Sequence, residues 1–103
     1  MADSWNSFKS MLREGSCPKN YGVLLNALWW EAKGNWGQAH EMANSLTTSD
    51  AAWIHAYLHR VEGDLSNAAY WYRRAGRKQP DCTLEEERKI LVEYFMGNTN
   101  LNS

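Results

Sequence analysis

Two histidines four residues apart are the side chains of this sequence whose types and spacing best suit chemistry. His55 and His59 fall in a segment of helical periodicity, so both imidazoles lie on one helix face, where they could hold a metal ion. His40, from the preceding segment, could supply a third ligand. Ala56 stands where the zinc-protease motif has its glutamate, so that motif is incomplete. We expect the histidines to be hydrogen-bonded in the core, and a small metal-dependent or ligand-binding enzyme is the alternative.

The segment 69–78 combines aromatic and basic side chains, a pattern that also occurs where proteins stack on bases and contact phosphates. On a helix, Tyr72 would face inward, while Tyr70, Arg73 and Arg74 would spread around the rim. No recognised nucleic-acid-binding module surrounds them, so we expect no nucleic-acid partner. An anionic protein surface suits the same basic residues.

Composition limits the class of protein. A chain of 103 residues, 44% of them hydrophobic, is enough for one domain with one core. Six tryptophans argue against a disordered chain, and a net charge of −1 gives no general attraction to nucleic acids or membranes. The start lacks the apolar run of a signal peptide, and the apolar stretch 23–30 is too short to cross a bilayer. Cys17 and Cys82 are isolated, so we expect free thiols and a cytoplasmic protein.

Six segments have the apolar spacing of helices, and none alternates as a strand would. At two places a glycine that can end one helix is followed by a polar residue that can cap the next, Gly34 with Asn35 and Gly63 with Asp64. The expected helices span about residues 4–14, 20–33, 36–46, 51–62, 65–75 and 83–96.

Two windows of the chain, 30–39 and 59–68, align with each other. In each, a helix ends at glycine, a polar cap follows at once, and alanine lies five residues beyond the glycine. Glycine supplies the positive φ of the turn, the cap binds backbone N–H groups of the second helix, and alanine lets the helices approach closely. The pattern predicts two helical hairpins, at about 20–46 and 50–76.

In these hairpins the chain resembles the tetratricopeptide repeat family. The family's signature positions are matched in the second hairpin by Ala56, Gly63, Leu65, Ala68, Tyr72, Ala75 and Pro80, and in the first by Ala27, Trp30, Gly34, Trp36 and Ala39. Ala43 and His59 stand where the family prefers aromatic residues, and the repeat is shorter than the usual period of about 34 residues. The stretch 53–76 also resembles small uncharacterised bacterial proteins of this helical type.

The resemblance implies an all-α fold in which antiparallel helix hairpins form a fragment of a right-handed superhelix. Two repeats cannot cover their own apolar faces. We therefore expect the amphipathic segments 4–14 and 83–96 to be N- and C-terminal capping helices. A homodimer is the other way to cover an open end.

The C-terminal end of the domain follows from local signals. Thr83 and Glu86 form a capping box that starts the last helix, and Gly97 is expected to end it. We expect a single helical repeat domain over residues 1–97, followed by a frayed tail at 98–103.

The resemblance also implies a groove, lined by the first helix of each hairpin. There Arg60, beside Trp53 and Tyr57, could clamp a carboxylate while the rings bury an apolar neighbour. Glu31 would lie opposite, and Trp53 is the one tryptophan expected to meet a ligand. In the alternative interpretation, Trp53 and Tyr57 pack under a capping helix and Arg60 is a solvated cation at a helix end.

The function expected from these features is that of a non-catalytic, cytoplasmic scaffold module of tetratricopeptide-like type. It would use no cofactor and make no membrane contact, and it would recognise a protein, a peptide or an acidic ligand in the groove.

Overall fold

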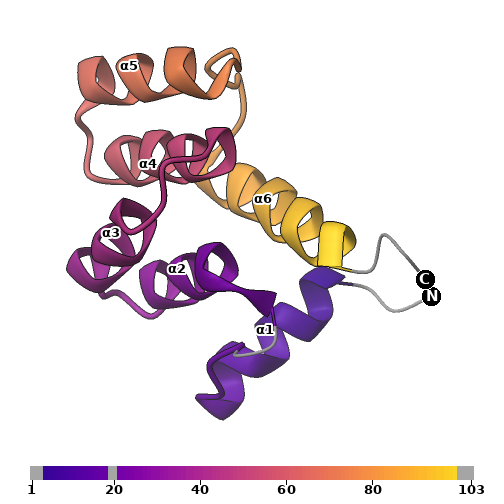
Figure 1. Cartoon of the computed structure of the whole chain (residues 1–103). Helices are drawn as coiled ribbons and strands as arrows, with labels where there is room; N and C mark the ends of the chain where they lie inside the picture. The colour runs from indigo at the N-terminus through magenta and orange to yellow at the C-terminus, as the bar shows by residue number, and fades with distance from the viewer. Residues whose placement is uncertain (1–3, 19–20, 100–103) are drawn as a thin grey trace.

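The computed structural model describes residues 4–18 and 21–99, with only the helical backbone for 98 and 99. Within these residues the chain forms helices and no strand. The six helices are α1 (Ser4–Glu14), α2 (Val23–Ala32), α3 (Trp36–Asn44), α4 (Ser49–Val61), α5 (Leu65–Ala75) and α6 (Leu84–Thr99) (Figure 1). The prediction of an all-α fold is confirmed.

Two helices begin two or more residues from their expected starts. α2 begins at Val23, directly after Gly22, and its expected start at residue 20 lies outside the described residues. α4 begins at Ser49, two residues early, because Thr48 is its N-cap. The Thr48 hydroxyl accepts a hydrogen bond from the backbone N–H of Ala51 at 3.1 Å.

The last helix, α6, extends further than the sequence indicates. The prediction that Gly97 ends it is wrong, because Gly97 lies inside the helix and lacks the positive φ of the turn glycines. Glycine permits a left-handed turn but does not impose one. Residues 98–99 therefore belong to α6, and the rest of the expected tail, 100–103, lies outside the described residues.

Helices that are adjacent in the sequence pack in pairs. α4 and α5 lie side by side in opposite directions and are joined at Gly63, while α2 packs against α3 beyond the turn at Gly34 (Figure 1). Contacts between α3 and α4 hold the two pairs together. α6 runs from α4 toward α1 and contacts α1, α2 and α4, so it covers the first helix of each pair (Figure 1).

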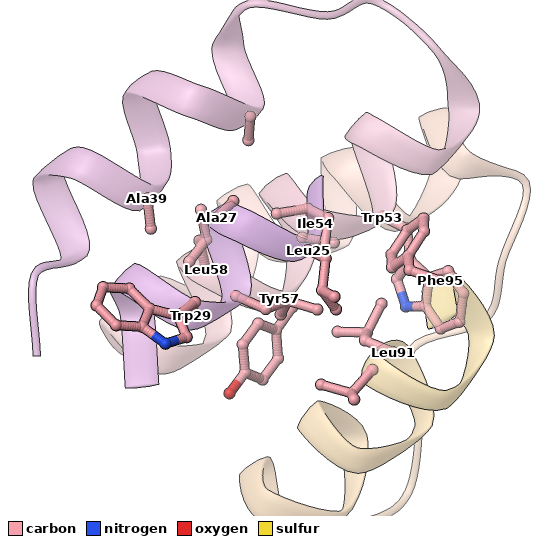
Figure 2. Packing of buried hydrophobic residues seen from close by; sticks show 14 of the residues in the cluster. Leu25, Ala27, Trp29, Ala39, Trp53, Ile54, Tyr57, Leu58, Leu91 and Phe95 are labelled. Carbon is pink, nitrogen blue, oxygen red and sulfur yellow. The ribbon is translucent and has the colours of Figure 1, made fainter. Parts of the chain in front are cut away.

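The centre of the molecule is α4. All its residues from 51 to 59 are buried, and α2, α3, α5 and α6 contact it. α2 is the second central helix, and its residues 25–29 are buried. A central position is what the apolar side chains on most sides of this segment predict. Figure 2 shows side chains of both helices in one cluster with Leu91 and Phe95 of α6.

The remaining described parts of the chain add to this core or lie at its edge. Phe8 of α1 is fully buried, and Trp5 stacks on it with ring centroids 6.0 Å apart.

Cys17 and Cys82 both have free thiols. Among the described helices, none combines the length and the apolar character needed to cross a membrane.

The turn between α4 and α5 gives a first prediction. Gly63→Ala is expected to lower the free energy of unfolding by about 1–2 kcal/mol, because Gly63 has a φ of 86° and a Cβ strains the left-handed conformation. The matched substitution Gly37→Ala, in helix α3 with only Asn35 Oδ1 nearby at 4.0 Å, should be neutral or stabilise by up to about 1 kcal/mol. Urea unfolding followed by circular dichroism measures both. Equal effects of the two substitutions would contradict the left-handed turn.

Candidate functional site

The residues expected to line a groove do lie in one region, but α6 covers them. Trp53 is 5% exposed and Tyr57 is 0% exposed. Arg60 and Glu31 form ion pairs with residues of α6. The two aromatic side chains thus pack under the C-terminal helix, as the alternative interpretation has it. Arg60 is not the solvated cation of that interpretation, since its side chain is 14% exposed and paired.

Arg60 does bind a carboxylate, and that carboxylate belongs to Glu87 of α6. Glu87 is 1% exposed. Arg60 Nη1 donates to Glu87 Oε1 at 2.7 Å, and Trp53 Nε1 donates to Oε2 at 3.2 Å. Tyr72 Oη lies 2.8 Å from Oε1 and 2.6 Å from Oε2. A buried carboxylate is tolerated when it is paired and hydrogen-bonded in this way. The acid-binding chemistry expected for a ligand therefore acts inside the fold.

Glu31 takes part in a second buried ion pair with α6. Arg88 binds it with both arms of the guanidinium, Nε to Oε1 at 3.0 Å and Nη2 to Oε2 at 2.7 Å. Tyr57 Oη donates to Oε1 at 3.0 Å. Burial, followed by the charge of Glu31, raises the pKa of Tyr57, so its hydroxyl keeps its proton and donates. Glu31 thus faces Arg88 rather than an open groove.

Trp53 still borders an open space, a pocket of about 330 Å³ that is also lined by Arg77 and Lys78. The guanidinium of Arg77 lies 3.5 Å from the Trp53 ring centroid, and the ring of Tyr94 packs against the same indole at 5.2 Å. A ligand would have to displace Arg77 to stack on Trp53.

Sequence reasoning missed the α6 residues of these two ion pairs. Glu87 is spaced by four residues from Leu91 and by eight from Phe95, which places it on the buried face of the helix. That spacing was the signal that could have identified Glu87 as buried, although an acidic first turn of a helix is usually solvated. Arg88 offered no such signal, because its partner Glu31 lies 57 residues away in the chain.

Three histidines meet on the opposite face of α4 from Trp53 and Tyr57. His40 lies in α3, and His55 and His59 lie in α4. One ring nitrogen of each lies within 4.8 Å of the other two. The ring centroid of His40 is 5.0 Å from that of His55 and 5.4 Å from that of His59. The histidines singled out by their spacing are therefore brought together with the third one from the neighbouring helix.

Two tryptophans flank this histidine cluster. The ring of Trp36 stacks on His40 at a centroid distance of 4.9 Å, and its Nε1 donates to the backbone oxygen of Leu58 at 2.7 Å. The ring of Trp71, from α5, stacks on His55 at 4.1 Å. The indoles thus hold the imidazoles from two sides, and α3, α4 and α5 all contribute.

Burial controls the protonation of the cluster. His55 is 2% exposed, and burial, followed by the neighbouring His40 and His59, lowers its pKa to about 4. Burial and His59 also lower the pKa of His40. Both imidazoles are therefore neutral at pH 7, with a lone pair on one ring nitrogen.

The hydrogen bonding of the histidines differs from the expected one. His59 Nδ1 pairs with Glu62 Oε1 at 2.6 Å. Nδ1 of His55 is buried and has no hydrogen-bond partner in the part of the chain that the structure describes. Of the two α4 histidines that were expected to be hydrogen-bonded in the core, His59 has a side-chain partner at Nδ1 and His55 does not.

A pocket of about 210 Å³ opens beside His55. The connector between α3 and α4 forms one wall, and α5 forms the other. Its lining consists of Asn44, Leu46, Thr47, Thr48, Ser49, Ala52, His55, Trp71 and Arg74. The guanidinium of Arg74 lies over the ring of Trp71 at 5.3 Å and donates to the hydroxyl of Tyr70 at 3.1 Å. The pocket therefore combines an oriented cation, hydroxyl groups and an aromatic wall.

Comparison with known proteins finds no matching family model, no similar curated protein and no similar solved structure. The tetratricopeptide-like resemblance therefore stays a prediction.

The Glu87 carboxylate gives a second prediction. Glu87→Gln is expected to lower the free energy of unfolding by about 3 kcal/mol, because it leaves Arg60 inside the protein without its charged partner. The control is Glu85→Gln, an exposed residue in the same helical turn, which should change stability by less than about 0.5 kcal/mol. Urea unfolding of both variants measures the difference. A small loss for Glu87→Gln would mean that the buried ion pair does not hold α6 in place.

Proposed function

We propose that the protein is a non-catalytic helical-repeat module that binds an acidic segment of a protein or peptide. In this proposal the binding surface is the pocket between the α3–α4 connector and α5, together with the basic end of α5. It replaces the groove expected at Trp53, Tyr57 and Arg60, because α6 covers that face.

The observation that carries the proposal is the environment of Arg74. Arg74 lines the pocket, and it belongs to none of the ion pairs formed within the described residues. Its guanidinium is oriented by Tyr70 and Trp71. A carboxylate that enters the pocket would meet this cation, while Trp71 and the 38% exposed side chain of Leu46 would contact an apolar neighbour.

The charge around this end of α5 supports an anionic partner. Arg73 and Arg74 lie in the last turn of α5, and the exposed Arg77 and Lys78 come after its C-cap, Gly76. The chain as a whole has a net charge of −1, so this concentration of cations is local. A local basic region attracts and orients an acidic partner without binding anions over the whole surface.

The arrangement of the helices supports a tetratricopeptide-like relationship. α2 with α3 and α4 with α5 are successive pairs, and a glycine of positive φ lies in the turn of each, Gly34 and Gly63. In such an arrangement α6 would be the helix that caps the first members of both pairs. Cytoplasmic localisation and a homodimer stay predictions.

The second candidate function is a small enzyme that uses the histidines. The convergence of His40, His55 and His59 is the observation in its favour.

The proposal predicts that Arg74→Ala weakens binding of a fluorescein-labelled acidic peptide by about tenfold or more, since one charge-assisted contact of about 1.4 kcal/mol is lost. Arg13→Ala is the matched control, because it removes one exposed arginine from α1 and should leave the affinity within about twofold. Fluorescence anisotropy measures both affinities, and the amide counterpart of the peptide, with Gln and Asn for Glu and Asp, should bind weakly. Equal binding of the two peptides, or equal effects of the two substitutions, would refute the proposed site.

A further inference from the structure

Only one member of the histidine cluster, His55, lines the pocket of the proposed peptide-binding surface, and all of the chain's histidines belong to the cluster. The sequence contains three histidines, and His40, His55 and His59 are the three that converge. Buried positions of a small core are mostly taken by apolar side chains, and a cluster of imidazoles costs stability there unless each ring nitrogen has a partner.

We propose that His40, His55 and His59 form a binding site for a divalent transition-metal ion, with Zn²⁺ as the preferred type. Imidazole nitrogens bind Zn²⁺ at about 2.1 Å, which puts the nitrogens of a tetrahedral site roughly 3.4 Å apart. The three ring nitrogens already lie within 4.8 Å of one another. The rings therefore need to close by about 1.4 Å at most, a movement within reach of side-chain torsions.

The two helices hold the rings in place before any metal binds. His55 and His59 are separated by one turn of α4, and their rings are stacked, with an angle of 18° between the planes. His40 is positioned from α3 by the stacked indole of Trp36, which is itself hydrogen-bonded to the backbone of α4 at Leu58. Ligands on rigid, packed elements lose little freedom when the ion binds.

Glu62 is placed as an outer-shell partner of the site. Its Oε1 lies 2.6 Å from His59 Nδ1, which leaves Nε2 as the ring nitrogen for a metal. A carboxylate on the second nitrogen of a metal-binding histidine sets the tautomer and the ring orientation, and it makes the imidazole a stronger ligand.

His55 supplies an independent observation that points to a ligand. Its Nδ1 is buried and has no hydrogen-bond partner among the described residues. The residue as a whole is only 2% exposed. A buried polar atom without a partner is uncommon and costly. An ion held between the three rings would offer a partner to a ring whose Nδ1 has none among the described residues.

The site has room for a fourth ligand and a path by which the ion can enter. Three protein ligands leave one position of a tetrahedral ion open. His40 is partly exposed, and the pocket of about 210 Å³ borders His55. Water or an anion from the pocket would complete the coordination.

Metal titration of the full chain, produced without a histidine tag, tests the proposal. Calorimetry should give one Zn²⁺ per chain, and Co²⁺ should develop the visible absorption of a tetrahedral nitrogen-ligated ion. His40→Gln is the main variant, because His40 is the partly exposed member and its loss leaves the two α4 histidines packed. It should weaken Zn²⁺ binding more than about 100-fold, since loss of an outer-shell partner alone costs about 10- to 100-fold.

Two carboxylates near the histidines distinguish a specific effect of Glu62 on His59 from a general effect of negative charge on Zn²⁺ binding. Glu62→Gln should weaken Zn²⁺ binding by about tenfold or more, whereas Glu41→Gln, which removes an exposed carboxylate next to His40, should have little effect. Circular dichroism verifies that each variant is folded. Unchanged Zn²⁺ affinity of His40→Gln, or no Zn²⁺ binding by the unaltered protein, would overturn the metal site. Neither result bears on peptide binding, which is measured without metal.

Discussion

The buried carboxylate of Glu87 decides how the C-terminal half of the molecule is assembled. It comes from α6 and binds Arg60 and Trp53 of α4 and Tyr72 of α5, so three helices meet at two oxygen atoms. A carboxylate at this depth is stable only if all these donors are in place. The next residue, Arg88, then reaches Glu31 of α2. The position of α6, and with it the contact of α6 with α1, depends on this arrangement.

This constraint also decides where a ligand can bind. α4 has polar and aromatic residues on two opposite faces, one with Trp53, Tyr57 and Arg60 and the other with His55 and His59. The first face is covered by α6, and its hydrogen bonds are made within the protein. The second face borders α3 and α5, where the chain leaves a pocket and a ring nitrogen without a partner. A ligand is therefore expected on the histidine face.

Local signals made most of the helices predictable. Asn35 and Asp64 cap their helices with side-chain hydrogen bonds to Gln38 and Asn67, as their spacing after a glycine indicates. The contacts that place α6 are of another kind, because Arg60 and Glu87 are 27 residues apart and nothing in the sequence pairs them. Arg60 was expected to bind the carboxylate of a ligand, and it binds that of Glu87 instead, because a sequence does not tell whether a carboxylate comes from a ligand or from the chain. The spacing of His55 and His59 predicted from the sequence that both lie on one face of a helix. The approach of His40 could not be predicted in the same way, because it depends on how α3 packs against α4.

The tryptophans and histidines are best understood as parts of one structure. Trp36 and Trp71 stack on His40 and His55, and an indole offers a flat apolar wall and one donor but no lone pair for a metal or a proton. If the cluster served packing alone, leucine or phenylalanine would fill the same space without an unpartnered nitrogen. The imidazoles add what the indoles lack, a set of convergent ring nitrogens that can accept a proton or bind an ion. The aromatic excess of the sequence thus includes two indoles that pack around the three histidines.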